Sequence, residues 1–329
     1  MLTRRTVLRQ AGVAASAALA LRTGVAAAAA ARTAINFDIP RGGCDCHVHV
    51  FGDPARFPFA AKRIYTPPQA SVDELLGLQK DLRLDRVVVV QPSVYGSDNA
   101  CTVDAVKRMG ARARGVAVID KSTPRKALEE MAEAGIRGVR LNLETNTAGR
   151  FDPADARALL DATAEQIKGL GWHIQMYTRI NIVSALKDHL AQLPFPVVVD
   201  HFGRGSPAAG PSQPDFIALL DLVKSGRAYV KISGAYRVSE KAPDYPDVLG
   251  LAQALVAANP DRIVWGTDWP HPNSDSARGK PLTELMTPFP IDDGLLLNQL
   301  PKWVPDAATR KKILVDNPAR LYGFGPVAG

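Results

Sequence analysis

Short runs of apolar residues alternate along this chain with longer amphipathic stretches. The nearly continuous hydrophobicity of the short runs is typical of strands that are buried on both faces. Alternation of such strands with helical patterns indicates βαβ units around a parallel sheet. The pattern predicts eight strands, at Cys44–Val50, Arg86–Ser93, Ala113–Asp120, Ile136–Leu143, Trp172–Thr178, Pro196–Phe202, Ala228–Ser233 and Arg262–Trp269.

Helix signals fall between these strands. Thr123–Ala134 has Pro124 near its start and Gly135 just past its end, and Ile180–Leu193 precedes Pro194, as expected of helix boundaries. No G-x-G-x-x-G motif follows a strand, which disfavours a dinucleotide-binding sheet. The length of 329 residues suits a barrel of about 250 residues. We therefore expect a single-domain α/β fold, a (β/α)8 TIM-like barrel.

The first 31 residues do not fit this repeat. Thr3-Arg4-Arg5-Thr6-Val7-Leu8 is followed by an alanine-rich apolar stretch, which predicts a twin-arginine export signal over 1–31 and the barrel over 32–329. Arg22 interrupts the stretch, which is too weakly hydrophobic for a good membrane span. We expect the twin-arginine export machinery to be a partner, with a periplasmic or secreted location and no stable membrane insertion. An alanine-rich surface helix and an uncleaved membrane tether are the alternatives.

Charge and cysteine content narrow the possible partners. The net charge is +7, and residues 1–31 contain four arginines and no acid, so subtracting those four leaves +3 for the rest. A small, dispersed charge argues against nucleic-acid binding. Cys44 and Cys46 lie two apart on a predicted strand, which makes them poor disulfide partners. We expect these two and Cys101 to be free thiols.

Two proline-rich insertions follow the first and last strands, at 52–68 and at 269 to about 290. Loops that follow barrel strands lie over the C-terminal mouth, where barrel enzymes place their active sites. His47 and His49 project to one face of the first strand, into the barrel, because side chains alternate along a strand. His201 and Asp268 end the sixth and eighth strands. These four residues predict a hydrolytic site in which Asp268 can serve as a general base.

Basic residues recur at other strand ends, namely Arg140, Arg204 and Arg237. Guanidinium groups bind carboxylates through paired hydrogen bonds. Together with Tyr65, Ser93 and Tyr177, they indicate a small, oxygen-rich, anionic substrate. His271 follows the last strand and could either bind substrate or pack on Trp269.

Three segments carry a family resemblance: 46–52 (CHVHVFG), 91–99 (QPSVYGSDN) and 266–273 (GTDWPHPN). The chain resembles amidohydrolase-related lactonases typified by 2-pyrone-4,6-dicarboxylate hydrolase, and 91–99 is also similar to D-galactarolactone isomerase. The resemblance covers essentially all of 32–329. It implies that Asp268 activates water while His47, His49 and His201 polarise a lactone carbonyl. The substrate positions that it implies are Tyr65, Ser93, Arg140, Tyr177, Arg204, Arg237 and Asn273.

The resemblance has one exception and one open choice. Asn146 stands where the pyrone hydrolase has a carboxylate-binding arginine, which argues against the pyrone dicarboxylate as the substrate. Metal-dependent relatives place a histidine on the fifth strand and some place lysine or glutamate on the fourth, whereas this chain has Tyr177 and Arg140. Lost ligands and an added cation weaken divalent binding, so we expect no cofactor. The alternative is one zinc ion on His47, His49, His201 and Asp268.

The leading hypothesis is thus a hydrolase acting on a small anionic lactone. A lactone isomerase would use the same residues, with a substrate hydroxyl as the nucleophile. A metal-dependent amidohydrolase or decarboxylase is the third possibility. A periplasmic binding barrel without turnover is the fourth, and the presence of every proposed catalytic group argues against it.

Overall fold

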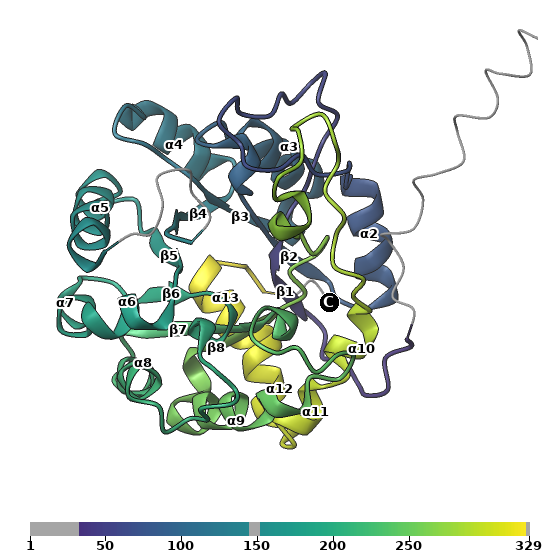
Figure 1. Ribbon diagram of the computed structural model, residues 1–329, viewed down its shortest axis with the longest axis vertical. Coiled ribbons are helices and arrows are strands. Elements are labelled where there is room, and N and C mark those ends of the chain that lie inside the picture. The colour runs from purple at the N-terminus through teal and green to yellow at the C-terminus, as the bar shows by residue number, and fades with distance from the viewer. Residues whose placement is uncertain (1–32, 145–151, 327–329) are drawn as a thin grey trace, which may run out of the picture.

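A computed structural model describes residues 33–144 and 152–326 of the chain, and Figure 1 shows the strands at its centre with the helices around them. Eight parallel strands form one sheet in sequence order. A parallel bridge between Val48 and Trp269 joins the last strand to the first, so the sheet closes into the predicted barrel. The strands are β1 (Cys44–Val48), β2 (Arg86–Val90), β3 (Ala113–Ala117), β4 (Ile136–Asn142), β5 (His173–Tyr177), β6 (Val197–Val199), β7 (Ala228–Ser233) and β8 (Ile263–Gly266). All eight predicted strands are confirmed, most with shorter bounds.

Helices connect successive strands and cover the outside of the barrel (Figure 1). The sequence predicted a single helix at 180–193. The structure instead has two helices, α6 and α7, that meet at Leu186. The described helices are α2 (Val72–Asp81), α3 (Ala100–Met109), α4 (Arg125–Glu133), α5 (Pro153–Gln166), α6 (Ile180–Ala185), α7 (Lys187–Gln192), α8 (Pro214–Lys224), α9 (Leu249–Ala258), α10 (Asp293–Leu297), α11 (Leu300–Trp303), α12 (Ala307–Lys311) and α13 (Asn317–Tyr322). No helix among the described residues is long and apolar enough to cross a membrane.

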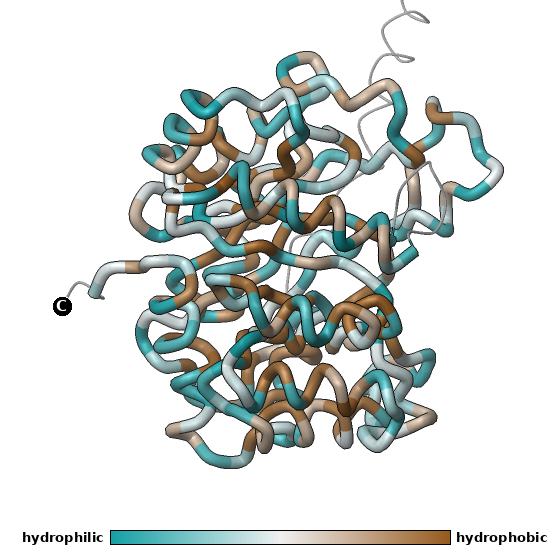
Figure 2. The backbone as a smooth tube through the Cα atoms, turned by 90° about the vertical axis from the view of Figure 1, so that its left-hand side faces the viewer, coloured by the Kyte–Doolittle hydropathy of each residue, from teal (hydrophilic) through white to brown (hydrophobic). Residues whose placement is uncertain are grey.

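An apolar layer fills the barrel beneath its mouth. Cys44 and Cys46 pack there with valines from β2, β3, β6 and β8, and Tyr322 of α13 joins them. Strict alternation would place these cysteines on the opposite face from His47, but the β1–β2 register shifts between Asp45 and Val48. This irregularity lets β1 contribute to the apolar layer and to the site above it. Figure 2 shows hydrophobic segments concentrated in the interior and hydrophilic ones on the outer turns.

The two proline-rich insertions contact each other, as expected of loops over one mouth. Thr66 forms a bridge with Leu285, and its carbonyl accepts from the Met286 amide at 2.7 Å. The Thr66 hydroxyl also donates to the Leu282 carbonyl at 2.6 Å.

The three cysteines are buried and free, which confirms the expectation of free thiols. The predicted signal and Asn146 lie outside the described residues.

Candidate active site

The four residues that the sequence singled out meet at the mouth of the barrel, and all are buried. The Nε2 atoms of His49 and His47 lie 3.4 and 3.6 Å from Asp268 Oδ1. His201 Nε2 lies 3.8 Å from Asp268 Oδ2. The predicted cluster is therefore present, with three imidazoles converging on one carboxylate.

The chain turns sharply at Asp268, whose φ of 66° lies in the left-handed region. Its Oδ2 accepts hydrogen bonds from Tyr236 Oη at 2.7 Å and from Arg237 Nε. Oδ1 has no hydrogen-bond partner in the described part of the chain. Burial alone would raise the pKa of Asp268, but the Arg237 charge holds it well below its usual range. The carboxylate is therefore ionised and keeps one oxygen available.

The three histidines are neutral at pH 7. Burial lowers the pKa of His47 and His49 and brings that of His201 to about 4. His49 Nδ1 contacts the Val90 carbonyl at 2.8 Å, and His201 Nδ1 contacts the Ser233 hydroxyl at 3.0 Å. A ring nitrogen that donates to a carbonyl leaves the other without a proton. His49 Nε2 is therefore an acceptor while His49 is neutral.

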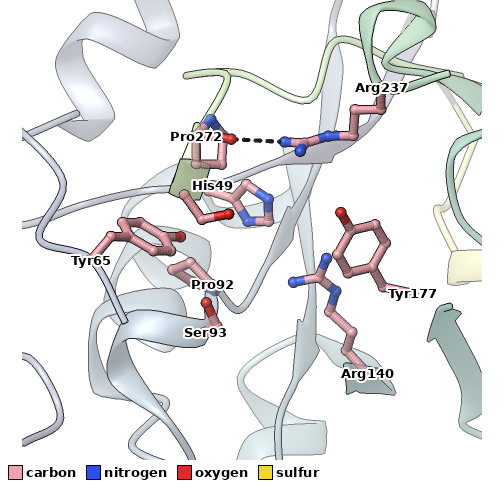
Figure 3. A pocket seen from close by; sticks show the side chains of 9 residues that line it. His49, Tyr65, Pro92, Ser93, Arg140, Tyr177, Arg237 and Pro272 are labelled. Carbon is pink, nitrogen blue, oxygen red and sulfur yellow. Dashed lines mark hydrogen bonds between the residues drawn. The ribbon is translucent and has the colours of Figure 1, made fainter. Parts of the chain in front are cut away.

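A small cavity opens beside His49 (Figure 3). Arg140 and Tyr177 stand on one side of it, Tyr65 and Ser93 on the other, and Arg237 lies near Pro272. The Arg140 guanidinium packs over the Tyr177 ring at 4.9 Å from its centroid. Five of the predicted substrate residues thus line one cavity, to which they contribute two guanidinium groups and three hydroxyl groups.

A larger outer cavity of about 680 Å³ shares Tyr177 and Arg237 with the small one. Arg204 and Asn273 line it, which places these two predicted residues at the entrance. Arg204 Nη1 donates to the Tyr177 hydroxyl at 3.2 Å. Three other arginines, Arg179, Arg237 and Arg278, line the same cavity. Glu144, Glu240 and Asp275 line it too, and Glu144 lies 3.2 Å from Arg179 and 3.8 Å from Arg204, so the entrance carries charges of both signs.

His271 is the exception among the predicted substrate residues, because it lies behind the wall of both cavities. Its Nδ1 is 3.2 Å from the Tyr236 hydroxyl, and its Nε2 is 3.1 Å from Asp293 Oδ2. Through Tyr236 it connects to Asp268. The structure thus gives His271 a supporting place beneath the site.

Sequence reasoning missed the polar groups that surround the cluster from below. Lys231 of β7 is fully buried, and so are Gln175 and Asp200. Gln175 Nε2 donates to Asp200 Oδ2 at 3.0 Å, and Arg140 Nε lies 3.6 Å from the same oxygen. The sequence did contain a signal for a buried polar group at this place, because Lys231 is a charged residue within the otherwise mostly apolar strand Ala228–Ser233.

The donor types at the mouth could hold a divalent cation. One ligand atom from each of His47, His49 and Asp268 lies within 4.8 Å of the others, and nitrogen and carboxylate donors suit zinc. Arg237 and Tyr236 already occupy Asp268 Oδ2, so Oδ1 is the carboxylate oxygen that could serve as a ligand. Arg140 and Lys231 add positive charge near the same atoms. The donors fit a metal by type, and they lie beside the cationic side chains of Arg237, Arg140 and Lys231.

The amidohydrolase family model matches residues 44–324, which span the whole barrel. The chain belongs to the amidohydrolase family. The family resemblance stated from the sequence is thus confirmed, and the site described above is the mouth of an amidohydrolase barrel.

Three relatives of this amidohydrolase cover most of its length. It is 39% identical over 294 residues to a 4-sulfomuconolactone hydrolase of Rhizobium radiobacter, covering 88% of this chain and 92% of the relative. It is also 39% identical over 295 residues to a 2-pyrone-4,6-dicarboxylate hydrolase of Comamonas testosteroni, covering 87% and 92%. A D-galactarolactone isomerase of Agrobacterium fabrum is 31% identical over 300 residues, covering 90% and 96%.

Proposed function

We propose that this amidohydrolase hydrolyses a carboxylated or sugar-derived lactone. The observation that carries the proposal is the ionised Asp268. Its Oδ1 has no hydrogen-bond partner among the described residues and lies near the His47 and His49 imidazoles, beside a cavity that contains Arg140 and Arg237. Two of the relatives are named for lactone hydrolysis. A base, carbonyl-polarising groups and anion-binding groups are the parts that this reaction needs.

In the proposed reaction, Asp268 takes a proton from water as the water oxygen bonds to the lactone carbonyl carbon. The carbonyl oxygen gains the electron pair, and those of the His47, His49 and His201 imidazoles that carry a proton on Nε2 stabilise it. The oxyanion then re-forms the carbonyl as the ring C–O bond breaks. The ring oxygen keeps the electron pair of that bond and takes the proton that Asp268 holds, which gives a hydroxy acid and restores the Asp268 carboxylate. Each hydrogen-bond donor aimed at such an oxyanion contributes about 3–4 kcal/mol.

Metal-independent turnover is part of the proposal, supported by the cations around Asp268. Purified enzyme should keep its lactone hydrolysis rate after exhaustive chelation, and added zinc should not increase it. The check is an initial-rate assay paired with elemental analysis of the same sample. Loss of activity on chelation, restored by zinc, would instead favour the metal-dependent amidohydrolase or decarboxylase.

Arg204 should hold an anionic group of the substrate at the entrance. Replacing it with methionine removes a charge-assisted hydrogen bond, so KM for an anionic lactone should rise about 10- to 100-fold. The kcat value and the KM for an uncharged lactone should change little. The matched control is Arg278→Met, because Arg278 lines the same cavity with its side chain 83% exposed. Equal effects on charged and uncharged lactones would contradict this role.

Lactone isomerisation is the second candidate, favoured by the similarity to the D-galactarolactone isomerase. Asp268 would then deprotonate a substrate hydroxyl, which attacks the carbonyl from within the same molecule. Turnover in ¹⁸O-labelled water separates the two reactions. Hydrolysis places the label in the product carboxylate, whereas isomerisation leaves the product unlabelled.

We also propose twin-arginine export to the periplasm or beyond, supported by Arg4-Arg5 and the alanine-rich stretch after it. Cell fractionation of the wild type beside a variant with both arginines changed to lysine tests this. An unchanged distribution of the variant would oppose twin-arginine export.

A further inference from the structure

Lys231 lies beneath the catalytic cluster with no exposed surface. Its Nζ donates to the Cys46 carbonyl at 2.8 Å and to Gln175 Oε1 at 2.7 Å. An ammonium group has three donors, so these two contacts leave one hydrogen. Two further polar atoms lie near Nζ, namely His47 Nδ1 at 3.4 Å and Asp200 Oδ1 at 3.7 Å, and only His47 Nδ1 is within hydrogen-bond distance.

His47 Nδ1 has a second polar neighbour, Asp200 Oδ1, also at 3.4 Å. The two contacts require opposite protonation, because Nδ1 accepts from an ammonium but must donate to a carboxylate. Lys231 meets the geometry of a hydrogen bond to Nδ1, whereas Asp200 Oδ1 has no hydrogen-bond partner within the described segments. The geometry therefore favours an unprotonated Nδ1.

We propose that Lys231 is a positioning residue that donates to His47 Nδ1 and thereby fixes the His47 proton on Nε2. The hydrogen bond made by one ring nitrogen sets the state of the other. His47 Nε2 lies 3.6 Å from Asp268 Oδ1, and neither atom has a hydrogen-bond partner among residues 33–144 and 152–326. The N–H is thus held beside the base and is available to the substrate carbonyl.

This arrangement makes His47 and His49 differ in which ring nitrogen carries the proton. The contact of His49 Nδ1 with the Val90 carbonyl leaves its Nε2 without a proton while His49 is neutral. Of these two neighbours of Asp268 Oδ1, His47 is the hydrogen-bond donor. A protonated Nε2 has no lone pair to bind a metal, so Lys231 also disfavours a metal ligand at this position.

The role of the His47 N–H toward a lactone carbonyl rests on the proposed function. The position of the His47 proton does not, so an experiment can refute either one without the other. The test is long-range ¹H–¹⁵N NMR of ¹⁵N-histidine-labelled wild type near pH 7, with His47 assigned through a His47→Gln variant. We expect protonated Nε2 and unprotonated Nδ1. A wild-type proton on Nδ1 would overturn the proposal, whatever the variants do.

Two matched variants separate positioning from folding. Lys231→Gln keeps an N–H donor without the charge, whereas Lys231→Met has similar length and no donor. In the methionine variant we expect the His47 proton to move to Nδ1, toward Asp200, and kcat to fall about 100-fold with little change in KM. The glutamine variant should keep the wild-type tautomer and a larger share of the activity. An unchanged tautomer in a folded methionine variant would also refute the role.

Discussion

Asp268→Asn is expected to reduce kcat for lactone turnover by about 10,000-fold, the upper end of what a positioned base contributes. An amide of nearly the same size cannot accept the proton that the carboxylate accepts. Binding should persist, because the cavity walls and Arg140 are unchanged. Steady-state kinetics measure the first effect, and calorimetry with the intact lactone on the inactive variant measures the second.

The control for this substitution is Asp73→Asn, which makes the same chemical change on the surface. Asp73 pairs with Arg108, and its side chain is 80% exposed, so wild-type kinetics are expected. Thermal unfolding of both variants checks that they are folded. Near-normal turnover by Asp268→Asn would remove Asp268 from the role of base, whichever reaction the enzyme performs.

The barrel and the central cluster could be predicted because each depends on local sequence. Every strand is an apolar run, and parallel strands must end at the same mouth. Histidines and an aspartate at the ends of β1, β6 and β8 therefore had to approach one another. The same reasoning predicted that both proline-rich insertions would cover the mouth.

The polar groups beneath the cluster could not be predicted, because their contacts depend on register across the barrel. Lys231 reaches Cys46 and Gln175 from β7 to β1 and β5. A register shift in β1 determines which of its side chains point inward. His271 belongs to a recognisable sequence motif. The direction of its side chain, however, depends on the turn at Asp268 and on a contact with Asp293, which lies 22 residues further along the chain.

Arg237→Met is expected to affect both stability and the pH profile. Arg237 pairs with the fully buried Asp268 and is itself only 13% exposed. Removing one member of a buried ion pair leaves an uncompensated charge, at a cost of about 3–5 kcal/mol in the free energy of unfolding. Arg237→Lys retains the charge and should lose less. Chemical denaturation of the three proteins at pH 8 measures the difference.

The pH dependence of the stability of Arg237→Met follows from the direction in which the pKa of Asp268 changes. In the wild type the Arg237 charge lowers the pKa of Asp268. The ion pair therefore stabilises the fold at pH values above about 3.9, the pKa of an aspartate in the unfolded chain, and this stabilisation is lost as the pH falls through the lower pKa of the folded state. Without Arg237, burial raises that pKa, and stability is instead lost as pH rises. The stability difference should therefore be larger at pH 8 than at pH 4.

Activity should follow the same titration. The wild type should hold its kcat/KM below neutral pH, because the Arg237 charge lowers the pKa of Asp268 and burial lowers the pKa values of the three histidines. In Arg237→Met the acid limb should move to higher pH, because a neutral Asp268 cannot act as the base. An acid limb at the wild-type position, in a folded variant, would mean that Arg237 binds substrate without controlling the ionisation of Asp268.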